Sequence, residues 1–138
     1  MIEKSITVRV RYAETDRMGY VYYGNYAVYF EVARVEMLRE LGLSYKKLED
    51  SGIILPVLDY AIQYKKPAYY DDLLTIKTYI RKKPTARIVF EYETFNNEGV
   101  LLNTAQVTLV VVNKETGKPM LPTSEFNGVF IPYFRDEK

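Results

Sequence analysis

The sequence predicts an α+β fold in which an antiparallel β-sheet of about five strands wraps around one long central helix. One stretch, residues 25–42, has the periodicity of an amphipathic helix, and several later stretches have the periodicity of strands. The strands follow one another without intervening helices, which excludes a doubly wound α/β fold. With 138 residues, we expect one domain spanning residues 1–138.

The first element expected is a half-buried strand over residues 6–12, where apolar and polar side chains alternate. Residues 13–19 are polar and include a glycine, and residues 20–23 form an aromatic run. This connection leads directly into the helical stretch.

The helix over residues 25–42 is predicted from apolar side chains at three- and four-residue spacing. The stripe consists of Ala27, Phe30, Ala33 or Arg34, Met37 and Leu41, with Leu38 beside it. Gly42 is expected to end the helix in the left-handed conformation. Ser44 is expected to cap a short second helix that reaches Asp50.

Four further strands are expected in meander-like succession, over residues 53–65, 73–82, 86–95 and 100–112. Pro56 confines part of the first of these to an edge or a bulge. Residues 96–99 form a hairpin turn, and residues 126–134 are expected to add a short strand. One such sheet around one helix is the hotdog architecture. It leaves strand edges uncovered, so a homodimer or homotetramer is expected.

The composition excludes several kinds of chemistry. There is no cysteine and no histidine, so disulfides, thiolate nucleophiles and Ser-His-Asp or Cys-His sites cannot form. Catalysis would depend on carboxylates, tyrosines, lysines, hydroxyls, backbone amides or an oxygen-ligated metal. No cofactor is expected.

The overall charge and hydropathy point to a cytoplasmic protein. The net charge of +1 argues against nucleic-acid binding. No apolar run approaches the ~20 residues of a membrane span, so no stable membrane insertion is expected. Glu3 and Lys4 lie where a signal peptide would need an apolar stretch.

The segment of residues 11–26 is the best candidate for a reactive site. It places Asp16 and Gly24 close to the start of the predicted helix. The free N–H groups of a first helical turn carry partial positive charge and can polarise a carbonyl oxygen. A carboxylate opposite such a turn is the best hydrolytic arrangement that a chain without histidine offers.

The same segment resembles the signature of the 4-hydroxybenzoyl-CoA thioesterase-like family. The shared positions are Tyr12, Thr15, Asp16, Gly19, Val21, Tyr22, Tyr23, Asn25 and Tyr26, followed by Phe30, Glu31, Ala33 and Arg34. A second stretch of likeness contains Tyr64, Pro67, Ala68, Asp71, Asp72 and Leu74. The resemblance covers roughly residues 4–122, and hotdog domains of this family hydrolyse acyl-CoA thioesters.

The resemblance implies a role for four residues. Asp16 would be the catalytic nucleophile or general base, and the backbone N–H of Tyr23 or Gly24 would polarise the thioester carbonyl. Tyr12 matches a tyrosine that some members place in the site, and Tyr23 falls where one subgroup has histidine and another tyrosine. The activity expected is hydrolysis of an acyl-CoA to a free acid and CoA.

Each of these residues also has a structural interpretation. Asp16 could be a turn or Asx-cap residue, and Glu14 is expected to be solvated. Glu31 and Arg34 are expected to form a surface or interface pair. The tyrosines between positions 20 and 29 are expected to fill the core and an interface, with some of them lining an acyl pocket.

Basic residues at predicted strand ends are candidates for binding the phosphates of CoA. They are Lys65, Lys66, Arg81, Lys82 and Arg87. Solvated edge charges are the simpler explanation for each of them.

Two other functions stay open: a non-catalytic module that binds acyl-CoA or acyl-carrier protein, and an acyl-carrier-protein thioesterase.

Overall fold

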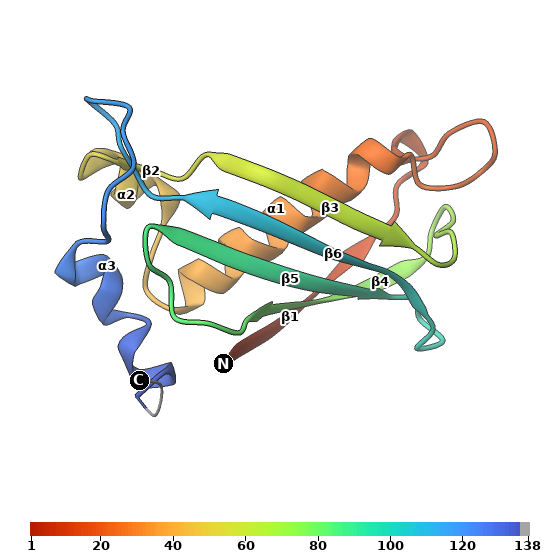
Figure 1. Ribbon diagram of the computed structural model, residues 1–138. Helices are drawn as coiled ribbons and strands as arrows, with labels where there is room; N and C mark the ends of the chain where they lie inside the picture. Colours follow the sequence, from red (N-terminus) through yellow and green to blue (C-terminus); the bar gives the residue numbers. More distant parts are fainter. Residues whose placement is uncertain (136–138) are drawn as a thin grey trace.

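A computed structural model describes residues 1–135 and consists of a five-stranded antiparallel sheet curved around one long helix (Figure 1). The strand order is β1-β4-β5-β6-β3, with bounds β1 (Ile2–Arg9), β3 (Val57–Tyr64), β4 (Leu73–Ile80), β5 (Arg87–Phe95) and β6 (Leu101–Val110). The helix α1 (Tyr23–Glu40) lies across one face of this sheet. The predicted α+β hotdog architecture is confirmed.

The helix α1 is held by an aromatic face that packs on the sheet. Phe30 is fully buried and stacks on Tyr92 of β5, with ring centroids 4.5 Å apart. The prediction that Ala27 lies in the buried stripe was wrong, because it is exposed and the buried face begins instead with Tyr26 and Tyr29. These large rings bury more apolar area than an alanine can, so they set the rotation of the helix.

The end of α1 and the short helix after it follow the sequence prediction closely. Gly42 has φ of +95°, the left-handed conformation expected after a helix end. Helix α2 (Tyr45–Asp50) then begins with Ser44 as its cap, whose side chain accepts a hydrogen bond from the Lys47 N–H at 3.1 Å.

Two of the predicted strands are each divided into two. Residues 53–65 give β2 (Ile53–Ile54) and β3, separated at Pro56, and residues 100–112 give β6 and β7 (Val112–Asn113). β2 and β7 pair with each other as a separate two-stranded sheet. The break at Pro56 has a simple cause, because proline has no N–H to donate to a sheet.

Two other predictions were wrong. β3 does not pair with β4 but crosses to the far side of the sheet and pairs with β6, so the meander includes only β4, β5 and β6. The tail is helical rather than extended, with α3 (Ser124–Gly128) and the short 3-10 helix η2 (Ile131–Tyr133). Thr123 caps α3 by accepting a hydrogen bond from the Phe126 N–H, which favours the helical start.

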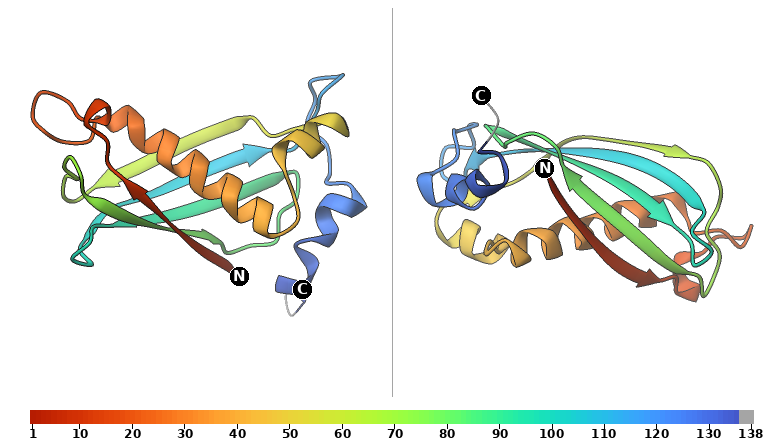
Figure 2. Two further views of the ribbon diagram at one scale, coloured as in Figure 1. Left: turned by 180° about the vertical axis from the view of Figure 1, so that it is seen from behind. Right: turned by 90° about the horizontal axis from the view of Figure 1, so that it is seen from below.

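This arrangement brings several connections together at one end of the sheet. Figure 2 shows the loop after β1, the start of α1 and the loop before β4 side by side, with α3 at the opposite end. The residues just after β3 reach the same end as the start of α1. Within residues 1–135, no helix is long and apolar enough to cross a membrane.

Candidate active site

Backbone hydrogen bonds join the loop after β1 to its neighbours at the start of α1. The Val21 N–H donates to the Ala68 carbonyl at 2.9 Å, and the Tyr22 N–H donates to the Glu14 carbonyl at 2.8 Å. A single antiparallel bridge also pairs Tyr20 with Tyr69. The loop is therefore fixed both to the 3-10 helix η1 (Tyr12–Glu14) and to the loop before β4.

The first turn of α1 has free backbone donors. Tyr22 precedes the helix in an extended conformation, and its carbonyl accepts from the Asn25 N–H at 2.9 Å. Among the hydrogen bonds of residues 1–135, none uses the N–H of Tyr23 or Gly24. These two groups are free to donate to a ligand oxygen, and the helix dipole makes them favourable for a negative one.

Gly24 is explained by the position of the neighbouring Tyr22 ring. A Cβ atom at position 24 would lie 2.9 Å from Cε2 of that ring, closer than carbon atoms normally approach. Glycine therefore lets the aromatic ring lie directly against the first turn, as a tight backbone approach requires.

Asp16 uses one carboxylate oxygen in the turn and leaves the other free. Its Oδ1 accepts from the Met18 N–H at 2.9 Å and from the Tyr20 N–H at 3.3 Å. Within residues 1–135, Oδ2 has no hydrogen-bond partner. The turn and the reactive interpretations of Asp16 are therefore compatible, because each concerns a different oxygen.

An open hollow connects Asp16 to the start of the helix. It is lined by Tyr12, Ala13, Thr15, Asp16, Arg17, Tyr22 and Asn25. Tyr22 and Asn25 lie immediately on either side of the two residues with free N–H groups. The hollow therefore joins Asp16 to the residues that flank the two unused backbone donors.

Of the two tyrosines predicted for the site, Tyr12 lines the hollow, whereas Tyr23 does not and is adjacent in sequence to Tyr22, which does. Tyr12 is 77% exposed and makes an edge contact with Tyr70, with ring centroids 5.6 Å apart. Tyr23 is 65% exposed and packs against Tyr22 at 4.6 Å. Both rings are exposed, and the Tyr12 ring is accessible to a ligand that enters the hollow.

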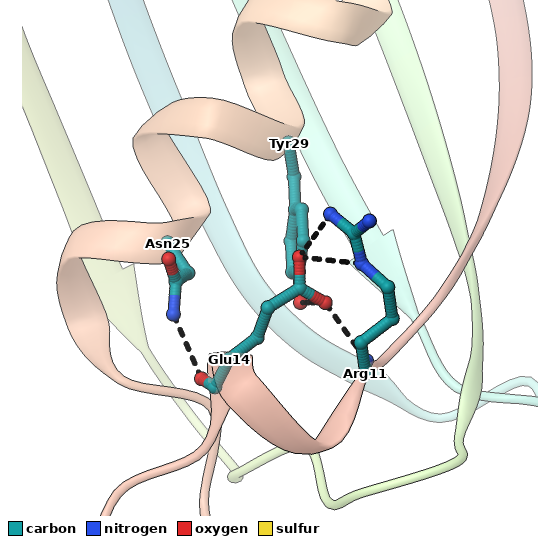
Figure 3. Close-up of polar contacts among 4 residues, drawn as sticks. All are labelled: Arg11, Glu14, Asn25 and Tyr29. Atoms are coloured by element: carbon teal, nitrogen blue, oxygen red, sulfur yellow. Dashed lines mark hydrogen bonds and ion pairs between the residues drawn. The ribbon is translucent and has the colours of Figure 1, made fainter.

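The prediction for Glu14 was wrong. It was expected to be solvated, but it is only 8% exposed and lies at the centre of a polar network (Figure 3). Its Oε1 accepts from the Arg11 N–H at 2.8 Å and from the Tyr29 hydroxyl at 3.0 Å, and its Oε2 accepts from the Arg11 guanidinium at 3.0 Å. Its main-chain carbonyl accepts from the Asn25 side-chain amide at 2.8 Å.

This network fixes the charge states of its members. Burial alone raises the pKa of Glu14, but the hydrogen bonds from Arg11 and Tyr29 outweigh it and hold that pKa below the ordinary 4.5. Burial and the hydrogen bond to Glu14 raise the pKa of the Tyr29 hydroxyl well above its ordinary value. Glu14 is therefore an anion and Tyr29 a neutral donor across the physiological range.

The buried Arg34 corrects a second prediction. It was expected to pair with Glu31 at the surface, but it is 8% exposed and its Nε donates to the Tyr45 hydroxyl at 3.2 Å. None of the ion pairs within residues 1–135 links it to Glu31. Arg34 thus joins α1 to α2 and lies away from the hollow.

The five basic candidates fall into two groups at opposite ends of the sheet. Lys65 and Lys66 follow β3, and their N–H groups donate to the Leu102 carbonyl at the end where α1 starts. Arg81, Lys82 and Arg87 lie at the other end, between β4 and β5, where Arg81 pairs with Glu91 at 2.8 Å. All five are exposed.

Among residues 1–135, no cluster of three acidic side chains could hold a metal ion.

The lowered pKa of Glu14 predicts a pH-dependent contribution to stability. A folded-state pKa below the unfolded one adds stability that is present above about pH 4.5 and is lost as the pH falls through the folded value. The difference in unfolding free energy between the wild type and Glu14→Gln should therefore be largest near neutral pH and shrink below pH 4.5. Urea unfolding of both proteins between about pH 3 and 7 measures it, and a difference independent of pH would contradict the prediction.

Known proteins resemble this chain over most of its length. The putative acyl-CoA thioesterase YneP of Bacillus subtilis is 39% identical over 82% of each chain. The acyl-CoA thioester hydrolase YbgC of Escherichia coli O157:H7 is 38% identical over 85% of this chain and 88% of that one. The crystal structure of a DHNA-CoA thioesterase from Staphylococcus aureus superimposes with a TM-score of 0.91 at 37% identity, covering 99% of this chain and 95% of that one.

A sequence profile of one family also matches residues 10–130, which include the hollow, the free helix start and most of the sheet. That stretch contains the whole of the Glu14 network as well. The chain belongs to the thioesterase-like superfamily.

Proposed function

We propose that this protein hydrolyses acyl-CoA thioesters to a free acid and CoA, with Asp16 as nucleophile or general base. Its relatives at 38 and 39% identity, named acyl-CoA thioester hydrolase and acyl-CoA thioesterase, identify it as a thioester hydrolase. The observation that supports the assignment to Asp16 is the hollow that it lines together with Tyr22 and Asn25, the residues that flank the unused N–H groups of Tyr23 and Gly24.

In the proposed reaction, the thioester carbonyl oxygen accepts hydrogen bonds from the first turn of α1. The negative charge that develops on this oxygen is stabilised by the N–H groups and by the helix dipole. A thioester is more electrophilic than an ordinary ester, so one carboxylate with an oxyanion donor can suffice.

Two routes are compatible with this geometry. As nucleophile, Asp16 adds to the carbonyl carbon, CoA leaves as a thiolate that takes up a proton, and water then hydrolyses the mixed anhydride. As general base, Asp16 removes a proton from water while the water oxygen adds to the carbon, and the tetrahedral intermediate expels the CoA sulfur with that proton. Both routes consume one water and yield one acid and one thiol.

Asp16→Asn should abolish most of the activity, because an amide is a poor nucleophile and a poor base. We expect a loss in kcat greater than the ~10²–10³-fold typical for removal of one oxyanion donor. The measurement is CoA release with a thiol-reactive dye over aliphatic and aromatic acyl-CoAs, including 1,4-dihydroxy-2-naphthoyl-CoA. The chain has no cysteine, so the protein adds no background.

Asp50→Asn is the matched control, since Asp50 is exposed on α2 and lies away from the hollow. It should retain wild-type kcat. Unchanged turnover in Asp16→Asn would move the site elsewhere. Absence of turnover on every acyl-CoA would favour the alternatives, an acyl-carrier-protein thioester or a non-catalytic binding module.

We further propose that Lys65 and Lys66 bind the phosphates of CoA. They are exposed and lie at the end of the sheet where α1 starts, whereas Arg81, Lys82 and Arg87 lie at the far end of the same chain. A single CoA molecule bound at the hollow is therefore more easily reached by Lys65 and Lys66 than by the far group.

The cytoplasmic location expected from the sequence stays a prediction.

Charge reversal distinguishes the two groups. The double variant Lys65→Glu/Lys66→Glu should raise KM for an acyl-CoA by about 10-fold or more with little change in kcat, because it removes two phosphate partners. The matched variant changes Lys82 and its exposed neighbour Lys83 in the same way (Lys82→Glu/Lys83→Glu), at the far end, and should leave KM unchanged. A rise in KM in the far-end variant alone would assign phosphate binding to the far group, reached from a second subunit.

We propose that the protein is a homo-oligomer that associates through β3. This strand lies at the edge of the sheet, with one side of its backbone unpaired within the described chain. Its aromatic side chains Tyr60 and Tyr64 remain 38 and 52% exposed although they contact α1. An exposed apolar edge strand is a template for pairing with another chain.

A charge in β3 should therefore shift the protein towards the monomer. Leu58→Lys places a charge at an exposed apolar position of the edge strand, where it would be buried by pairing. Light scattering after size-exclusion chromatography should show a mass near 16.2 kDa for the variant and a multiple of it for the wild type. A wild type that elutes as a monomer would contradict the proposal.

A further inference from the structure

We propose that Glu14 is a positioning residue that holds the first turn of α1 in the orientation needed for catalysis. This inference rests on the proposed function, because it concerns the two N–H groups that would polarise the thioester carbonyl. Glu14 itself does not touch the substrate position; it acts through the helix start.

The main chain of Glu14 holds both sides of the reactive turn. Its carbonyl oxygen accepts from the Tyr22 N–H and from the Asn25 side-chain amide, both at 2.8 Å. The residues between these two donors are Tyr23 and Gly24, whose own N–H groups have no hydrogen bond within residues 1–135. One carbonyl oxygen therefore restrains the backbone immediately before and after the free donors.

The side chain of Glu14 holds the same helix at a second point. Its Oε1 accepts from the Tyr29 hydroxyl at 3.0 Å, and Tyr29 lies four residues after Asn25 on the same face of α1 (Figure 3). Two attachments one turn apart restrain the rotation of a helix as well as its position.

Arg11 fixes the carboxylate itself. Its N–H donates to Oε1 at 2.8 Å, and its guanidinium donates to Oε2 at 3.0 and 3.3 Å. Arg11 follows β1 directly, so the restraint on the helix start is connected to the sheet. The carboxylate cannot move towards the helix or away from it without breaking several hydrogen bonds.

This arrangement separates the orientation of the first turn from the stability of the fold. The body of α1 is held by buried Phe30, Ala33, Met37 and Leu38, none of which takes part in the hydrogen bonds of Glu14. Loss of the Glu14 side chain should therefore loosen the first turn while the helix remains packed. Misplacement of a catalytic group by about 1 Å can cost ~10²-fold in rate.

The test compares Glu14→Ala, Glu14→Gln and Tyr29→Phe by kcat, KM and hydrogen exchange. Glu14→Ala should lower kcat by roughly 10–100-fold with KM changed less than about threefold. Glu14→Gln should recover much of the loss, because its amide oxygen can still accept from Arg11 and Tyr29. Tyr29→Phe removes one hydroxyl only and should give a smaller fall in kcat, and it also serves if Glu14→Ala does not fold.

Tyr79→Phe is the matched control. It also removes a tyrosine hydroxyl that donates to a glutamate, Glu93, but on β4 and β5 away from the helix start. It should leave kcat unchanged. In Glu14→Ala, the hydrogen-bonded amides of Tyr22 and Asn25 should exchange faster than in the wild type, while those of residues 30–38 should not.

The outcomes separate this inference from the proposed function. Wild-type kcat in folded Glu14→Ala, with Asp16→Asn inactive, would overturn the positioning role and leave the proposed function intact. A rise in KM at constant kcat would also overturn it, since that pattern belongs to substrate binding. Absence of thioester hydrolysis by the wild type would overturn the proposed function. Unchanged exchange of the Tyr22 and Asn25 amides in Glu14→Ala would overturn the positioning role, whatever the activity.

Discussion

The packing of α1 against the concave face of the sheet is the contact on which the rest of the structure depends. Phe30 and Tyr92 stack at 4.5 Å in its middle, and the buried residues on either side extend this contact along the helix. The 18-residue helix is about 27 Å long, roughly the length of the eight-residue strands β1 and β4, so its start emerges where these strands end. It does so beside the loops that follow β1 and precede β4, so the position of the candidate site is a consequence of core packing.

Apolar packing is non-directional, so it places the helix without fixing the angles of its first N–H groups. The directional contacts occur at that end of the helix, where Glu14, Arg11, Asn25 and Tyr29 form one hydrogen-bonded set. A buried carboxylate is costly unless it is fully hydrogen-bonded. The Glu14 carboxylate holds α1 through the Tyr29 hydroxyl, which an apolar side chain at this position could not do.

Local periodicity was sufficient to predict the helix, its stop at Gly42, the cap at Ser44 and most strands. The position of β3 at the far edge was not predictable in this way, because strand order depends on pairing between distant segments. Glu14 was missed because an acid in a polar loop is usually solvated. Its spacing of three from Arg11, on a 3-10 turn, was the signal that could have suggested a pair. The comparisons establish the family, whereas the roles of Asp16 and the helix start stay predictions.

In the proposed mechanism, the absence of histidine makes the orientation of the reacting groups important. A histidine base can be adjusted through its pKa and its two ring nitrogens, whereas a carboxylate offers two equivalent oxygens whose roles must be separated by contacts. In Asp16, the N–H groups of Met18 and Tyr20 occupy Oδ1 and thereby orient Oδ2 before any substrate binds. The Glu14 carbonyl in turn orients the N–H groups at the start of α1, because it accepts hydrogen bonds from Tyr22 and Asn25 on either side of them. Reorganisation is then small at the moment of reaction, which is the condition under which fixed dipoles stabilise a transition state best. The Asp16 turn and the attachment of the helix start to Glu14 both look purely structural. In the proposed mechanism, these two restraints would allow a chain without histidine or cysteine to hydrolyse a thioester.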